Sequence, residues 1–387
     1  MVVNYEFLDE EPIENVITCL HYKVDKVVFF GYHDVVEKYR ERTAVFLKKY
    51  CDVMSVVFHE VSATDLKSVL KTMRAEIAQE KGRGSKVYFD ITGGEDLILF
   101  AFGMLSKEFG APVHMFDIGK DRLIEPDPET KTGISKDIVE RKIKLDLDMF
   151  IEMRGGVINR TLHKRIKNDD DGDFSEDISN IWKVARKHFD YWNPFSDFLR
   201  TNMVPDENLE VSEKTAIVTI ELRESRTKLR SLSKLNAIID DLAACGILTG
   251  VSHTAGEYRF CFKNQKIKEC LWEGGSILEL HTYESEKKNS DDCEVGVHLD
   301  WDGVIHTESE TDVLNEIDVL SITGNIPTFI SCKSGKMGSN QTLYALYELD
   351  TVAARFGGKY AKKELVTVHK PSDIYYDRAT EMGIKIR

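Results

Sequence analysis

Short apolar runs alternate with longer amphipathic stretches in the first third of the chain. The apolar runs lie at residues 27–30, 56–58 and 87–91, and helix-length stretches follow them at 35–49, 64–79 and 97–109. This alternation predicts βαβ units and a parallel sheet, to which residues 2–8 add a further strand. We therefore predict an α/β domain over residues 1–150.

A glycine-containing turn, Thr92-Gly93-Gly94, joins the strand at 87–91 to the helix that follows it. Two glycines let backbone N–H groups come close to a ligand, and a helix amino terminus favours phosphate. Tight turns also use glycine for conformational reasons alone. The place of this turn between a strand and an apolar helix favours a ligand-binding role.

Two strand-like runs near the carboxyl terminus carry polar side chains where a buried sheet is not expected to have them. Residues 315–320 and 329–333 flank a turn at 324–327. Because strand faces alternate, a hairpin can bring Asp318 close to Lys333. An acid that holds a divalent cation beside a lysine is the arrangement of a metal-dependent phosphodiesterase. An exposed polar edge hairpin with solvated charges is the alternative.

These runs resemble the PD-(D/E)xK nuclease superfamily. They resemble more closely the nuclease domain of CRISPR-associated effectors that carry a CARF domain, a sensor of cyclic oligonucleotides. Three pieces match in order: a glycine-led helix opening at 272–280 with Glu279, the strand ending in Asp318, and Lys333. The family pattern has an acid two residues before the lysine, where this chain has Ser331. The resemblance implies a restriction-endonuclease-like α/β domain.

The helix that follows offers an acid to replace the one missing at Ser331. Gln341, Glu348 and Arg355 recur every seven residues and so share one stripe, beside an apolar face. Superfamily members exist in which the acid has moved onto this helix, so we predict Glu348 as the replacement. A solvated position on the helix surface is the alternative.

The nuclease resemblance also implies a catalytic set and a cofactor. Carboxylates favour the hard ions Mg²⁺ or Mn²⁺ over zinc. By resemblance, the metal ligands are Glu279, Asp318 and Glu348, and Lys333 orients water or stabilises the transition state.

The segment from Tyr88 to Gly94, with the apolar helix behind it, resembles the CARF domain, which has a Rossmann-like fold. In that family the glycine turn contacts a cyclic oligoadenylate, and two copies dimerise so that one ring lies across the two-fold axis. The ligand contacts carried over are Thr92, Gly93 and Gly94, with Asp96 as a helper. The first strand leads to Asp9, whose carboxylate can accept a ribose hydroxyl but does not attract phosphate. A homodimer that binds cyclic tetra-adenylate is therefore expected.

The length of 387 residues and the hydrophobic content of 42% suit two or three domains. Between the matched regions, a helix at 229–245 ends at Gly246 and a strand at 257–262 follows, an order that resembles a winged-helix module. Such a module binds duplex DNA in some proteins and is a spacer in others. The predicted organisation is a sensor domain at 1–150, a linker with a possible winged-helix-like segment at 151–265, and a nuclease domain at 266–387.

The formal net charge of −14 argues against a protein whose main task is tight, nonspecific DNA binding. It is compatible with an enzyme that needs only a local basic channel. Such a channel is expected from Lys333, Lys336, Arg355, Lys359, Lys362 and Lys363. The seven cysteines lack CxxC spacing, and neither a membrane-spanning run nor a signal peptide is found. We therefore expect a cytoplasmic protein without structural zinc.

The combined prediction is an ancillary effector of type III CRISPR systems, which binds cyclic oligoadenylate and then hydrolyses DNA, RNA or both. An alternative from another class is a ligand-controlled transcription regulator with an inactive nuclease fold. Ser331 and the possible wing favour that alternative, and the joint presence of Glu279, Asp318 and Lys333 opposes it. A third possibility is slow degradation of the ligand by the sensor, which the turn at Thr92 opposes because it supplies no general base.

Overall fold

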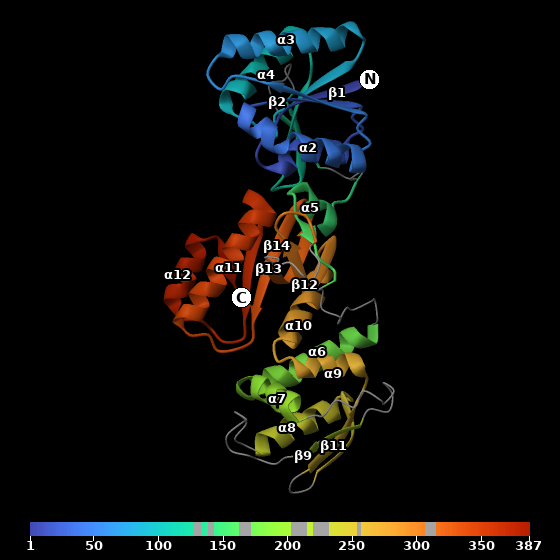
Figure 1. Cartoon of the computed structure of the whole chain (residues 1–387), viewed down its shortest axis with the longest axis vertical. Helices are drawn as coiled ribbons and strands as arrows, with labels where there is room; N and C mark the ends of the chain where they lie inside the picture. Colours follow the sequence, from blue (N-terminus) through green and yellow to red (C-terminus); the bar gives the residue numbers. More distant parts are fainter. Residues whose placement is uncertain are drawn as a thin grey trace.

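The computed structural model describes residues 1–126, 133–137, 143–161, 172–202, 215–219, 232–253, 257–305 and 315–387. They form three parts stacked along the long axis of the molecule (Figure 1). An amino-terminal α/β domain lies at one end, a sheet formed largely by the carboxyl-terminal third lies in the centre, and a mainly helical part lies at the other end. No helix in these ranges is both long enough and apolar enough to cross a membrane.

The amino-terminal domain is built on a seven-stranded sheet of order β3-β2-β1-β4-β5-β6-β7. Its strands are β1 (Val2–Phe7), β2 (Lys26–Gly31), β3 (Ser55–Glu60), β4 (Lys86–Asp90), β5 (Val113–Asp117), β6 (Arg122–Pro126) and β7 (Gly133–Asp137). The first five strands pair in parallel, and β6 and β7 extend the sheet in antiparallel pairs. The predicted Rossmann-like parallel arrangement is confirmed.

Helices cover both faces of this sheet. They are the 3-10 helix η1 (Pro12–Asn15) and the α-helices α1 (Ile17–His21), α2 (His33–Tyr50), α3 (Leu66–Gly82) and α4 (Asp96–Phe109). Along β2, Val27 and Phe29 pack in one core with α1 and α2, whereas Val28 and Phe30 pack in another with α3 and α4. The strand is buried on both faces, which is why its apolar run is continuous in the sequence.

A six-stranded sheet of order β16-β15-β14-β13-β12-β8 forms the centre of the molecule. Its strands are β8 (Val157–Ile158), β12 (Asp292–Asp300), β13 (Asn315–Thr323), β14 (Ile326–Lys333), β15 (Lys362–Thr367) and β16 (Ile384–Ile386). Its helices are α10 (Ser276–Lys287), α11 (Ser339–Gly357), η2 (Gly358–Tyr360) and α12 (Asp373–Glu381). Ile330 packs with α10 and Phe329 packs with α11, so these helices cover opposite faces.

The predicted hairpin near the carboxyl terminus is confirmed, because β13 and β14 pair in antiparallel register. Gly324 in its turn has a φ of +68°, a conformation that glycine adopts at little cost.

The remaining described residues form the mainly helical part. Its helices are α6 (Gly172–Lys187), α7 (Phe189–Asn202), α8 (Leu232–Ala244) and α9 (Gln265–Trp272), and its strands, in sheet order β10-β11-β9, are β9 (Thr215–Thr219), β10 (Leu248–His253) and β11 (Glu257–Phe262). Gly246, with a φ of +74°, lies between α8 and the hairpin of β10 and β11. This is the order of helix, glycine and strand that the sequence predicted.

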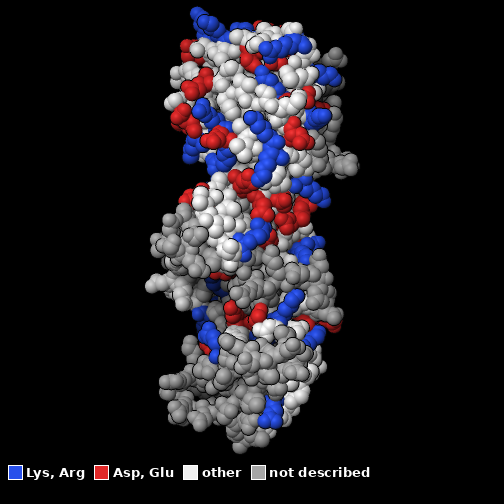
Figure 2. All heavy atoms as spheres, turned by 45° about the vertical axis from the view of Figure 1, so that its right-hand side comes forward, with Lys and Arg blue, Asp and Glu red and all other residues white. Residues whose placement is uncertain are grey.

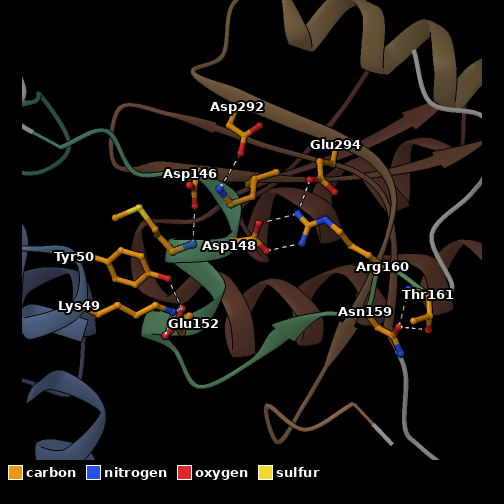
Figure 3. Close-up of polar contacts among 12 residues, drawn as sticks. Lys49, Tyr50, Asp146, Asp148, Glu152, Asn159, Arg160, Thr161, Asp292 and Glu294 are labelled. Atoms are coloured by element: carbon orange, nitrogen blue, oxygen red, sulfur yellow. Dashed lines mark hydrogen bonds and ion pairs between the residues drawn. The ribbon is translucent and has the colours of Figure 1, made fainter. Parts of the chain in front are cut away.

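A short segment joins the amino-terminal domain to the central sheet (Figure 3). On one side, Glu152 of α5 (Leu147–Met153) accepts hydrogen bonds from Lys49 at 2.8 Å and from Tyr50 at 2.5 Å, both at the end of α2. On the other side, Arg160 donates at 2.7 Å both to Asp148 and to Glu294 of β12. These hydrogen bonds and ion pairs connect the segment to both domains.

Candidate functional site

The pairing of β13 and β14 brings Asp318 and Lys333 together. Nζ of Lys333 lies 3.8 Å from Oδ2 of Asp318, and the two side chains are 33% and 15% exposed, respectively. Because strand faces alternate, both side chains project toward α11, as does Ser331 between them. An acid and a lysine therefore share one partly buried site.

Hydrogen bonds from β14 hold Asp318 in place. Its Oδ2 accepts from the N–H of Cys332 at 2.6 Å and from the hydroxyl of Ser331 at 3.2 Å. Ser331, at the position where the nuclease pattern has an acid, thus orients the neighbouring carboxylate without adding a second one. A carboxylate at this position would face the charge of Asp318 and would need a cation between the two groups.

A groove of about 630 Å³ lies beside this pair, where α11 meets the loop that follows β14. Lys333 lines it from the end of β14 and Lys336 from the loop, and Gln341, Tyr344 and Glu348 line it from the helix. Glu348 is exposed in the groove, and α11 covers the sheet face to which Asp318 and Lys333 belong. The structure therefore places the acid predicted on the helix in the same groove as the lysine.

Glu279 approaches β14 from the opposite face of the sheet. It lies in the first turn of α10 and is 8% exposed. The buried thiol of Cys332 lies on the same face as α10 and contacts the hydroxyl of Thr282 at 3.6 Å. Burial raises the pKa of this thiol, the charges of Asp318 and Glu279 raise it further, and Lys333 opposes them. The thiol therefore stays protonated, which does not suit a nucleophile. Glu279 and Asp318 both act on this thiol, so the two carboxylates lie within electrostatic reach of one position.

The carboxylates fit a hard cation that the substrate helps to hold. No three His, Cys, Asp or Glu side chains in the described ranges form a complete metal-binding cluster. Mg²⁺ commonly takes one or two carboxylates and completes its shell with waters and substrate phosphates. Asp318 and Glu348, on the same side of the sheet, can supply two such ligands, and Glu279 lies behind them.

The mainly helical part of the molecule makes a contact that the sequence did not predict. Asn193 of α7 donates to the hydroxyl of Ser334 at 3.2 Å, directly after Lys333. A Cβ added at Gly274 would lie 3.0 Å from Oδ1 of Asn193, so the glycine-led opening before α10 makes room for this contact. Helix α7 therefore packs against the loop that positions the lysine.

The turn at 92–94 lies at the carboxyl end of β4, next to the end of β1. The N–H of Thr92 donates to Oδ1 of the buried Asp90 at 2.8 Å, and its hydroxyl accepts from the N–H of Phe116 at 2.9 Å. Gly94 has a φ of +129°, and a Cβ at Gly93 would lie 2.9 Å from Oε2 of Glu14. Any other residue would have a strained backbone at position 94, and its side chain would crowd Glu14 at position 93.

The two acids predicted beside this turn differ in environment. Asp96 is exposed in the first turn of α4. Asp9 follows β1, and burial raises its pKa, whereas Lys359 and the N–H of Gly94 lower it. Asp9 and the turn thus form one polar site at the carboxyl ends of β1 and β4, where the strand order reverses and open α/β sheets bind ligands.

A cavity of about 580 Å³ adjoins Asp9 and lies between the amino-terminal domain and the central sheet domain. Its basic side chains are Lys38 and Arg42 of α2, Arg154 after α5, Arg355 of α11 and Lys359 of η2. On the face shown in Figure 2, basic and acidic side chains are interspersed over the amino-terminal domain. The cavity therefore gathers positive charge next to a loop that the sequence alone showed as acidic.

Three guanidinium groups meet in this cavity. Arg154 is 8% exposed and pairs with Glu11, while its backbone carbonyl accepts from Arg42 at 2.7 Å and from Arg355 at 2.9 Å. Burial, with a further contribution from Arg355, lowers the pKa of Arg154 to about 10. An anion would relieve this crowding of positive charge.

The prediction of one basic channel around Lys333 was wrong for Arg355 and Lys359, which line the interdomain cavity. Helix α11 has 19 residues, so it is about 28 Å long. The groove lies along its first half, and Arg355 and Lys359 lie at or beyond its far end. Lys363 is also engaged elsewhere, donating to Asp350 at 2.7 Å.

Glu6 of β1 is a buried acid with no place in the sequence-based predictions. Burial raises its pKa well above the ordinary range, the charge of Asp90 raises it further, and a hydrogen bond from Asn4 opposes them. Its Oε2 has no hydrogen-bond partner within the described part of the chain. The fold therefore favours the protonated form of this side chain.

Fold and site together define a class of protein in which an α/β ligand-binding domain is joined to a nuclease-like sheet domain. Residues 268–387 match the family model described as Card1-like, endonuclease domain, so the chain carries an endonuclease domain of this kind. The nuclease domain expected from the sequence is thereby confirmed. No curated protein matches the chain by sequence.

Solved structures share the fold of the whole chain. Protein VC1899 from Vibrio cholerae has a TM-score of 0.72 at 18% identity, over 100% of this chain and 93% of that chain. Can2 from Sulfobacillus thermosulfidooxidans, in complex with cyclic tetra-adenylate, has a TM-score of 0.67 at 13% identity, over 100% and 93%. A type III CRISPR defence DNA nuclease activated by cyclic oligoadenylate has a TM-score of 0.51 at 13% identity, over 98% of this chain and 51% of that chain. The chain thus has the fold of a CARF-domain effector nuclease, as its sequence predicted.

Proposed function

We propose that this protein is a nuclease of type III CRISPR defence that is activated by a cyclic oligoadenylate. One observation carries the proposal: a Card1-like endonuclease domain, with Lys333 3.8 Å from Asp318, shares a chain with a glycine turn at the ligand-binding edge of a parallel sheet. The likeness in fold to Can2, solved in complex with cyclic tetra-adenylate, supports that ring as the activator.

The sensor offers contacts for each part of such a ring. Backbone N–H groups at the turn 92–94 and the start of α4 favour phosphate. Asp9 accepts from a ribose hydroxyl, and Asp96 lies at the rim. The cations of the adjoining cavity, among them Arg42 and Lys359, offset the acidic loop.

The reaction is the metal-dependent hydrolysis of phosphodiester bonds in DNA, RNA or both. Asp318 and Glu348 on one side of the sheet, with Glu279 behind them, are the residues that would hold Mg²⁺ or Mn²⁺, and the cation would supply polarisation of the scissile phosphate. Lys333 neutralises charge that develops on the phosphate or orients the attacking water. Ser331 keeps Asp318 oriented through its hydrogen bond.

The active form is a homodimer with α4 at its interface. Phe100 and Met104, four residues apart on one face of this helix, are 59% and 40% exposed, and a second copy of the chain would cover this small apolar patch. Helix α4 begins directly after the turn 92–94. A dimer about α4 therefore brings two such turns near one axis, where a single ring can touch both.

The test is cleavage of labelled single-stranded DNA, single-stranded RNA and supercoiled plasmid in Mg²⁺ or Mn²⁺, with and without cyclic tetra-adenylate. Cutting that depends on both the metal and the ligand is the expected result. Tight ligand binding without cutting in either metal contradicts the proposal. That outcome would favour a ligand-controlled transcription regulator, a role to which Ser331, in place of the missing acid, already points.

A further inference from the structure

The groove beside Lys333 presents a tyrosine to solvent. Tyr344 of α11 is 69% exposed, as is Ile374. No other tyrosine among the exposed large apolar side chains of the described residues is as exposed. It lines the groove with Lys336 and Met337, which follow β14. An aromatic ring is therefore held open at the entrance to the site that contains Asp318 and Lys333.

Spacing along α11 places this ring in line with the polar groups of the groove. Asn340, Tyr344 and Glu348 are four residues apart, so they share one face of the helix, and all three line the groove. Tyr344 thus lies one turn from Glu348, the acid that faces the same groove as Lys333. A group that rests on the ring therefore lies about 6 Å, one helical turn, from a group held by Glu348.

We propose that Tyr344 stacks on an unpaired base of the substrate next to the scissile phosphate, with Lys336 on the backbone and Asn340 at the edge of the base. The inference rests on the proposed nuclease function and deepens it. A base that stacks on the ring is unpaired, so the substrate at this site is a single strand. Every base has a face that can stack on an aromatic ring, so this contact orients a strand without selecting its sequence.

The charges of the groove favour a nucleic-acid strand over an apolar protein segment as its occupant. Lys333 and Lys336 line the groove together with the ring, and Glu348 is the sole acid among the described residues of this lining. A strand offers the phosphates that these lysines attract and the base that the ring needs. An apolar peptide would offer a phosphate to neither lysine and would leave Lys333 with Asp318 alone.

Binding separates this inference from the question of cleavage. Fluorescence anisotropy is measured for a fluorescein-labelled thymidine dodecamer and for a dodecamer of the same backbone without bases, in EDTA so that nothing is cut, with cyclic tetra-adenylate present. The proteins are the full-length wild type, Tyr344→Ala, Tyr344→Phe and Tyr347→Ala. Tyr347 is the matched control, because it is exposed on the same helix, its hydroxyl accepts from Arg378 at 3.0 Å and it does not line the groove.

Wild type and the Tyr344→Phe and Tyr347→Ala variants are expected to bind the strand with bases roughly tenfold more tightly than the baseless strand. The Tyr344→Ala variant is expected to lose that preference and to keep its affinity for the baseless strand, which shows that the groove is intact. The inference would be overturned if wild type and Tyr344→Ala had the same preference for the strand with bases. It would also be overturned if the wild-type protein bound neither strand. If the preference behaves as expected but nothing is cut in Mn²⁺, the nuclease proposal fails and the stacking site stands.

Discussion

Nζ of Lys359 lies 2.7 Å from the carboxylate of Glu14, and this ion pair crosses the boundary between the sensor and nuclease domains. Tyr360 donates to the same carboxylate at 2.5 Å. Glu14 in turn lies against Gly93 of the ligand turn. We therefore expect a ligand that displaces the turn to disturb contacts at the end of α11, whose other end lines the groove beside Lys333.

Replacing Lys359 by methionine tests whether this ion pair carries the activation. We expect cyclic tetra-adenylate to bind within a few-fold of wild type, while cleavage at saturating ligand falls by about 5- to 150-fold, the range of common coupling energies. Calorimetry gives the affinity, and a cleavage assay gives the rate. Lys362→Met, at the start of β15, is the control. Weaker binding with a normal saturated rate would instead make Lys359 a ligand contact.

Asp318→Asn is expected to lower metal-dependent cleavage by at least about 100-fold, because the amide keeps a hydrogen-bond acceptor for the N–H of Cys332 but loses the charge that holds a cation. Ligand binding by the sensor should not change. Glu316→Gln, two residues earlier on the same strand face, removes an exposed acid and should cut as wild type does. Substantial activity in Asp318→Asn would exclude this carboxylate from the site.

Ser331→Asp restores the acid of the nuclease pattern beside Asp318. Without metal the two carboxylates repel each other, so the melting temperature should fall by about 2–4 °C, which corresponds to a loss of about 1 kcal/mol. Saturating Mn²⁺ should raise it by more in this variant than in wild type. Differential scanning fluorimetry with and without Mn²⁺ measures both effects, and Ser331→Asn controls for size. Equal metal-induced shifts in the three proteins would show that no cation binds between these positions.

Phe100→Glu tests the proposed dimer interface on α4. The side chain is 59% exposed, so a charge there should not harm the fold of one protomer. It should convert the dimer to a monomer in light scattering coupled to gel filtration, and abolish activation by cyclic tetra-adenylate. Phe109→Glu would disturb the core and is unsuitable, so Lys107→Glu at the end of the same helix is the control. A dimer of unchanged mass would place the interface elsewhere.

Glu6→Gln is expected to stabilise the protein, and more so at high pH. The pKa of Glu6 is raised in the folded state, so the folded state binds more protons than the unfolded state above the ordinary glutamate pKa of about 4.3. Stability therefore falls as the pH rises from there through the folded pKa, by at most about 1.4 kcal/mol per pH unit for this one group. The glutamine variant lacks this loss. Urea titrations at pH 5 and pH 8 measure how much Glu6→Gln stabilises the protein. An equal stabilisation at both pH values would contradict the prediction.

The sequence by itself determined the elements and the local chemistry of this protein. The apolar run at 27–30 predicted a strand of a parallel sheet, and alternation along the carboxyl-terminal hairpin predicted that Asp318 would meet Lys333. Both predictions depend on contacts between neighbours in a helix, strand or hairpin, which the spacing of residues fixes. The helical repeat also placed Glu348 on one stripe with Gln341, and both residues line the groove.

Only the tertiary structure decided which distant segments share a site. The interdomain cavity takes Arg42, Arg154 and Arg355 from three elements, and no spacing in the chain relates them. Arg355 lies on the same helical stripe as Glu348, yet the length of α11 carries it to the other domain. The partner of Glu14 and the position of Asn193 beside Ser334 likewise follow from how domains pack, because such contacts depend on the placement of whole helices and sheets rather than on local sequence.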